Sequence, residues 1–139
     1  MSLLNKYYCS NRKGYNLLEK VCPGQWFEFH TKPLIYKDDD IKLNIIIIEL
    51  IDLKDNFFCS ECREHIKSFY EKYPLNEYIK NKMKDNGYSK SQSIFRWTWL
   101  LHNNVNDRLD KETMPYSLAY DMYTQITKNK KGCSEVCRK

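Results

Sequence analysis

The chain has 139 residues, the size of one domain, and its 23 Lys and Arg against 18 Asp and Glu give a net charge of +5 at pH 7. This charge is small and scattered along the chain, so no nucleic-acid partner is expected. A membrane helix needs about 20 consecutive apolar residues. The longest apolar run is residues 45–48, so no membrane span is expected. The first residues lack the apolar core of a secretion signal, so no such signal is expected.

The chain contains only four Gly and four Pro, which indicates helices joined by few turns rather than a turn-rich sheet. We therefore predict an all-α fold. Residues 1–22 show no periodicity and predict a loop or arm. A short helix is expected over residues 25–30, ended or kinked at Pro33.

The acidic run 38–40 predicts the start of a helix over residues 41–54, because carboxylates favour a helix N-terminus. Apolar residues cover more than one face of this helix, so it needs two partners, the core and a second subunit. A buried strand is the alternative for such a β-branched run.

Capping residues and prolines predict the remaining helices. Ser60 is a candidate N-cap, Gly87 a C-cap, and Ser89 with Gln92 resembles a capping box. Pro115 suits a first-turn position. The four helices expected from these signals span residues 60–73, 76–84, 89–108 and 115–130.

The most informative motif is Cys59-x-x-Cys62. At a helix N-terminus the backbone dipoles stabilise a thiolate, the nucleophile of disulfide exchange and the form that binds metals. A thioredoxin fold is disfavoured because it needs the strands of a βαβ unit around the motif, whereas the flanking segments are predicted to be helices. Two buried thiols without a redox role are one alternative. A zinc site is the other, and its ligands would be Cys59, Cys62 and His65 with His102 or the pair Cys133 and Cys137.

A second dense patch spans residues 97–111. On a helix, His102 and Asn106 lie four residues apart and face the same way as Leu109, with Trp99 one turn earlier. Such a face suits a flat ligand. The alternative is a core helix with a hydrogen-bonded histidine.

Three elements in this order resemble the Erv/ALR family of FAD-linked sulfhydryl oxidases over about residues 22–127. They are Trp26-x-x-x-His30, Cys59-x-x-Cys62 and His102-Asn103-x-Val105-Asn106-x-x-Leu109-x-Lys111. The short chain and Cys62-x-x-His65 look most like the compact forms of large cytoplasmic DNA viruses. The resemblance implies a compact four- to five-helix bundle that binds FAD non-covalently and forms a homodimer through its first two helices.

The resemblance also implies roles for single residues. Cys62 would contact the flavin and Cys59 would exchange with the incoming dithiol, with electrons passing through FAD to oxygen and giving hydrogen peroxide. Lys111 would neutralise phosphate charge. Tyr120 or Tyr123 would close the adenine pocket. The expected FAD-binding residues are Trp26, His30, His102, Asn103, Val105, Asn106, Leu109, Lys111, Tyr120 and Tyr123, and no metal is expected.

Family members often carry a shuttle disulfide on a mobile tail, and Cys133 and Cys137 are the candidates here. A Cys9–Cys22 bridge, a bridge from Cys22 to the tail, and tail thiols without a role stay open as alternatives. The sequence departs from the family at Cys22, where Gly is common, and at Pro33, which would shorten or bend the first helix.

We therefore expect an N-terminal arm (1–22), a sulfhydryl oxidase domain (23–130) and a flexible C-terminal tail (131–139). The expected substrates are a protein thiol or thioredoxin-like partner and molecular oxygen. A zinc-stabilised Cys/His interaction module without enzymatic activity is the alternative function. Because no targeting signal is visible and the compact form fits a viral redox pathway, we expect a cytoplasmic location, in the host or the virion if viral, with the mitochondrial intermembrane space as the alternative.

Overall fold

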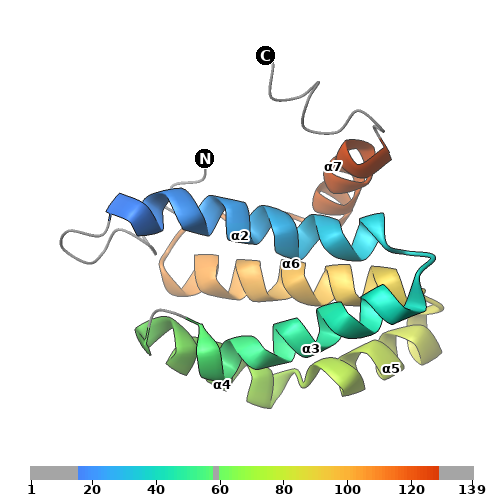
Figure 1. Ribbon diagram of the computed structural model, residues 1–139, viewed down its shortest axis with the longest axis horizontal. Coiled ribbons are helices and arrows are strands. Elements are labelled where there is room, and N and C mark those ends of the chain that lie inside the picture. The colour runs from blue at the N-terminus through green and yellow to red at the C-terminus, as the bar shows by residue number, and fades with distance from the viewer. Residues whose placement is uncertain (1–15, 58–59, 129–139) are drawn as a thin grey trace.

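The computed structural model describes residues 16–57 and 60–128, which contain six helices and no strand (Figure 1). The predicted all-α fold is confirmed. The helices are α2 (Asn16–Ile35), α3 (Asp40–Asn56), α4 (Ser60–Lys72), α5 (Leu75–Asn86), α6 (Lys90–Arg108) and α7 (Tyr116–Lys128). In these ranges, every helix is too short or too polar to cross a bilayer.

Helix α6 is the central element, because it contacts each of the other five described helices. Figure 1 shows α2 running alongside α6, with α3 below them, α4 and α5 following α3, and α7 standing at the far side of α2. Ile94, Phe95 and Trp97 of α6 are fully buried. Ile94 and Trp97 belong to the main core, whereas Phe95 packs with Leu34 and Ala119 in a second cluster. The indole N–H of Trp97 donates to the Tyr73 carbonyl at 2.8 Å, which satisfies a buried donor.

Helix α2 is longer than the sequence predicted. It begins at Asn16, so the loop expected over residues 1–22 is wrong from Asn16 onward, while residues 1–15 lie outside the described part of the chain. The helix also continues past Pro33 to Ile35 rather than ending at the proline. The Pro33 ring is fully buried and its carbonyl accepts from the Ser91 hydroxyl at 2.6 Å. This packing against α6 offsets the hydrogen bond that proline removes from the helix.

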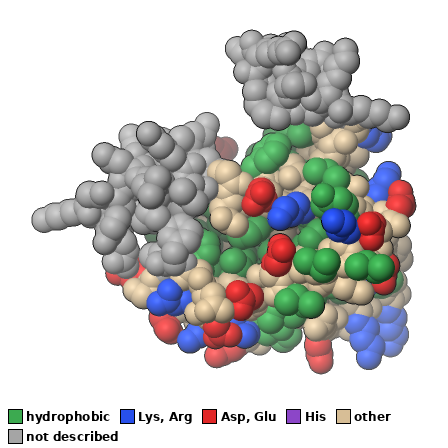
Figure 2. Space-filling view, viewed as in Figure 1, with side chains coloured by type: hydrophobic (Ala, Val, Ile, Leu, Met, Phe, Trp, Pro, Cys, Tyr) green, Lys and Arg blue, Asp and Glu red, His purple; other side chains and the backbone are tan. Residues whose placement is uncertain are grey.

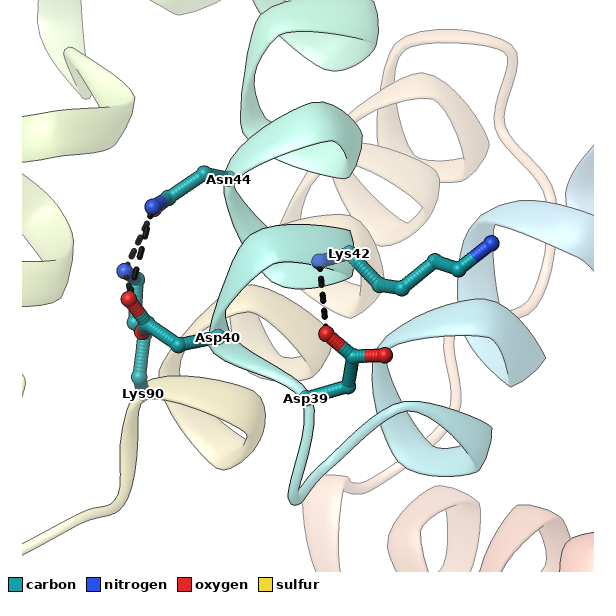
Figure 3. Close-up of polar contacts among 5 residues, drawn as sticks. All are labelled: Asp39, Asp40, Lys42, Asn44 and Lys90. Carbon is teal, nitrogen blue, oxygen red and sulfur yellow. Dashed lines mark hydrogen bonds and ion pairs between the residues drawn. The ribbon is translucent and has the colours of Figure 1, made fainter.

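Helix α3 starts where the acidic run predicted. Asp39 is the N-cap, and its Oδ1 accepts from the Lys42 backbone N–H at 3.1 Å (Figure 3). Lys90, at the start of α6, donates from Nζ to Asp40 Oδ1 at 2.9 Å and also to Asn44 (Figure 3). The starts of α3 and α6 are thereby joined, although an exposed ion pair of this kind contributes at most about 1 kcal/mol.

The two apolar faces of α3 have different environments. Leu43, Ile46, Ile47 and Leu50 are buried in the core. Ile41, Ile45 and Ile48 are 75%, 47% and 67% exposed. The alternative of a buried strand is therefore wrong, and the helix presents an apolar stripe on its outer side.

The other capping signals are confirmed with small shifts. Ser60 is the first residue of α4 rather than the residue before it. Gly87 ends α5 with φ of 66°, the left-handed conformation that glycine adopts without strain. Ser89 and Gln92 form both bonds of the capping box at α6. Helix α7 follows Pro115 directly.

Candidate active site

Helices α2 and α6 bring three predicted rings together. Trp26 and His30 are four residues apart on α2 and share a face, while His102 reaches them from α6. The Trp26 and His102 rings are stacked with centroids 3.9 Å apart and planes 6° apart. The His30 ring lies 5.3 Å from that of His102, with the planes 15° apart. Residues 72 or more positions apart in the sequence thus form one flat stack.

Hydrogen bonds fix the two imidazoles in this stack. His30 Nε2 lies 3.1 Å from His102 Nδ1. On its other side, His30 Nδ1 lies 2.9 Å from Thr98 Oγ1. The Thr98 hydroxyl in turn donates to the Phe95 carbonyl at 2.7 Å. Three polar groups are therefore connected in a line that ends at His102.

Both histidines are neutral at pH 7. Burial lowers the pKa of His30 to about 3, helped by the neighbouring His102. Burial also lowers the pKa of His102 to about 4. A neutral imidazole can donate from one nitrogen and accept at the other, so the pair serves in stacking and hydrogen bonding rather than as a cation.

These lowered pKa values predict that acid weakens the fold. Below pH 6.5 the unfolded chain binds a proton on each histidine, whereas folded His30 and His102 stay neutral down to about pH 3 and pH 4. The free energy of unfolding therefore falls as the pH drops from 6.5 to about 4, by up to about 1.4 kcal/mol per pH unit for each histidine. Urea unfolding followed by circular dichroism at a series of pH values measures this slope. A free energy of unfolding that stays constant from pH 6.5 to about pH 5 would contradict it.

An open cavity of about 480 Å³ adjoins the stack. Its walls include His30, His102, Asn106, Lys111 and Tyr123. Two buried polar atoms of these walls, His102 Nε2 and Asn106 Oδ1, have no hydrogen-bond partner among the described residues. Buried polar atoms are almost always paired, so an exception in a cavity wall indicates a ligand partner. Ring faces, acceptors and a lysine together suit a nucleotide-type ligand.

Asn103 shapes the cavity by holding the loop after α6. Its side-chain amide donates to the Met114 carbonyl at 2.8 Å and accepts from the Met114 backbone N–H at 3.2 Å. The Trp99 indole N–H donates to the same carbonyl at 2.7 Å. The Lys111 backbone N–H donates to the Asn106 carbonyl at 2.7 Å. The loop that carries Lys111 is therefore fixed to α6 at two points.

The two candidate tyrosines lie in different places. The Tyr123 ring is 4.9 Å from that of His30 and lines the cavity. Burial raises the pKa of the Tyr123 hydroxyl. The Tyr120 hydroxyl instead accepts from Gln92 Nε2 at 3.1 Å, and its ring packs on Phe95. Tyr123 is therefore the better candidate for the aromatic residue that closes the adenine pocket.

Cys62 belongs to an apolar cluster whose other members share a cavity with the ring stack. Its side chain, in the first turn of α4, is only 4% exposed and packs with Phe57, which follows α3, and with Ile66 of α4. Phe57 and Ile66 also line a small apolar cavity of about 20 Å³, whose other walls include Trp26 and Val105. The thiol cluster and the ring stack thus border the same apolar space. Leu109 packs against the main core. Cys59, Cys133 and Cys137 lie outside the described residues.

A model of the Erv1/Alr family matches residues 23–128. The chain belongs to this family. It is 32% identical over 105 residues to an FAD-linked sulfhydryl oxidase of African swine fever virus, covering 74% of this chain and 79% of that protein. It is 28% identical over 107 residues to sulfhydryl oxidase 1 of Arabidopsis thaliana, covering 76% of this chain and 18% of that protein. No solved structure matches.

Membership of the Erv1/Alr family does not favour the alternative zinc module. The described residues contain no group of three or more His, Cys, Asp or Glu side chains placed to hold a metal ion. His65 Nε2 lies 2.7 Å from Nη1 of Arg108. Burial and this guanidinium lower the pKa of His65. A cation next to the ring nitrogen would repel a metal ion there.

Thr98 and Met114 are two site residues of this Erv1/Alr chain that the sequence motifs do not include. Thr98 lies four residues before His102, so the helical spacing places both on one face and was the signal that could have found it. Met114 holds Asn103 through its backbone N–H and carbonyl, and backbone groups carry no sequence signal. The site thus contains residues of the family motifs together with Thr98 and Met114, whose contacts with those residues become visible only in the structure.

Proposed function

We propose that this protein is an FAD-linked sulfhydryl oxidase that forms disulfides in protein thiols. Two thiols lose two protons and two electrons and become a disulfide, and molecular oxygen takes them up as hydrogen peroxide. Bound FAD supplies the two-electron chemistry between the two reactions. One observation carries the proposal: Trp26 of the ring stack lines the small apolar cavity that Phe57 and Ile66 also line, and His102 of the same stack lines the open cavity.

The residues of the cavity fit the chemical parts of FAD. The stacked rings offer flat surfaces to a ring system. His102 Nε2 and Asn106 Oδ1 offer two acceptors without partners in the described structure. Lys111 offers a cation to the phosphates. These features support the assignment of Trp26, His30, His102, Asn106, Lys111 and Tyr123 to the FAD site.

Cys62 and Cys59 are the proposed redox pair. Cys62 lies in the first turn of α4, where the apolar side chains of Phe57 and Ile66 pack against it and keep it from water. In this proposal Cys62 faces the cofactor, Cys59 exchanges with the substrate dithiol, and Cys133 with Cys137 serves as the shuttle. A cytoplasmic location is part of the same proposal and is supported by the African swine fever virus relatives.

The purified protein gives a direct test. We expect a visible flavin spectrum on the order of one FAD per chain after dialysis against a chelator. We also expect oxygen uptake when dithiothreitol or a reduced protein is added. A colourless protein that unfolds on losing metal to the chelator would contradict the proposal and support the zinc module.

We also propose that the protein forms a homodimer through the outer face of α3. Ile41, Ile45 and Ile48 follow one another at spacings of four and three residues, which places them on one stripe. Figure 2 shows hydrophobic side chains reaching the surface between charged ones on this side of the molecule. A second copy of the chain would cover the stripe and remove its apolar surface from water.

Ile48→Glu is expected to give a monomer. The side chain is 67% exposed in one chain, so the fold should survive, whereas a buried, unpaired carboxylate would oppose dimer formation. Size-exclusion chromatography with light scattering measures the mass. Met83→Glu is the matched control, because Met83 is an exposed apolar residue on α5. A dimer that survives Ile48→Glu unchanged would show that α3 is not the interface.

A further inference from the structure

The line of hydrogen bonds from Phe95 to His102 has a direction that the structure determines. The Phe95 carbonyl can only accept, so the single hydroxyl proton of Thr98 points toward it. The Thr98 oxygen must therefore accept the bond from His30, and His30 Nδ1 carries the proton. A neutral imidazole has one N–H, so His30 Nε2 is an acceptor.

The hydrogen bond to His30 determines the tautomer of His102. Because His30 Nε2 accepts, His102 Nδ1 must carry the proton of the bond between them. His102 Nε2 is then unprotonated and offers a lone pair. This atom is one of the buried polar atoms without a partner in the described structure, and His102 lines the open cavity.

We propose that Thr98 is a positioning residue that sets the tautomers of both histidines, so that His102 presents an acceptor to an N–H or O–H donor of bound FAD. The inference rests on the proposed function, since it needs FAD in this cavity. Thr98 itself is fully buried beneath His30 and acts only through the two rings.

Removing the Thr98 oxygen should exchange the donor and the acceptor in the hydrogen bond between His30 and His102. In Thr98→Val, a proton on His30 Nδ1 would have no acceptor in the core, so the proton moves to Nε2. His30 Nε2–H then donates to His102 Nδ1, and His102 carries its proton on Nε2. The cavity would face FAD with a donor in place of an acceptor.

The test measures tautomers and FAD affinity separately. Long-range ¹H–¹⁵N correlation spectra of the FAD-loaded protein identify which ring nitrogens are protonated, and His65→Asn leaves only the two rings of interest. We expect both rings of the wild type, and both rings of Thr98→Ser, to carry the proton on Nδ1. We expect Thr98→Val to carry both protons on Nε2 and to bind FAD about tenfold more weakly, the value of one hydrogen bond.

The wild-type spectrum by itself shows which ring nitrogens carry the protons of these hydrogen bonds. The inference can therefore be contradicted even if Thr98→Val fails to fold. A wild-type His30 protonated on Nε2 would overturn it. So would reversed tautomers in Thr98→Val with unchanged FAD affinity, or a loss in Thr98→Ser as large as in Thr98→Val. A wild-type protein that binds no FAD would contradict the proposed function itself, which separates the two failures.

Discussion

Cys62→Ser is expected to lower thiol oxidase turnover on the order of a thousandfold while FAD stays bound. Cys62 packs with Phe57 and Ile66, which line the same small apolar cavity as Trp26, and a serine hydroxyl cannot form a disulfide with Cys59. The protein groups that line the larger cavity are untouched. Oxygen uptake with dithiothreitol measures turnover, and the ratio of flavin to protein absorbance measures bound FAD.

Cys62→Ala is the companion variant. Serine places a hydroxyl in the apolar cluster with Phe57 and Ile66, whereas alanine does not, so the pair separates a folding defect from the loss of sulfur. Both variants should be equally inactive. Turnover retained in either one would contradict the role of Cys62, and loss of FAD from both would mean that Cys62 helps to build the cofactor site.

Trp26→Leu is expected to weaken FAD binding roughly thirtyfold or more, because it removes the ring that stacks on His102 and that lines the small apolar cavity together with Phe57 and Ile66. The variant should also lower the free energy of unfolding by about 2–4 kcal/mol, since Trp26 is a buried core residue. Fluorescence of FAD released on dilution gives the dissociation constant, and urea unfolding gives the stability.

Trp97→Leu is the matched control for the effect on binding. Trp97 is a fully buried tryptophan of the same core, and its indole bonds to the Tyr73 carbonyl away from the ring stack. It should lose a similar amount of stability and bind FAD as the wild type does. Equal FAD affinity in Trp26→Leu and Trp97→Leu would contradict the assignment of Trp26 to the FAD site.

The local signals of the sequence predicted most helix boundaries because those boundaries depend on neighbouring residues. Asp39, Gly87 and the Ser89–Gln92 capping box act within one helical turn of the ends they define. The extent of α2 was mispredicted because it depends on distant residues. Pro33 is accommodated by Ser91 of α6, and no local pattern reports that contact.

The residues of the candidate site were likewise predictable from sequence motifs, whereas their arrangement depends on contacts between distant helices. The motif positions of Trp26, His30 and His102 were visible in the sequence, but their stacking depends on how α2 meets α6. The choice between Tyr123 and Tyr120 also needed the fold, because α7 turns only one of them toward His30. The roles of Cys59, Cys133 and Cys137 stay predictions, since these residues lie outside the described part of the chain.

Anaerobic titration of the FAD-loaded protein with dithiothreitol tests most directly whether Cys62 and the cofactor form one redox site. If the Cys62 cluster and the ring stack border the same space as described, the dithiol should bleach the visible flavin absorbance, and admitting oxygen should restore it with release of hydrogen peroxide. Cys62→Ala should show no bleaching. A wild-type flavin that keeps its absorbance while dithiothreitol reduces the protein's disulfides would contradict the proposed path of electrons.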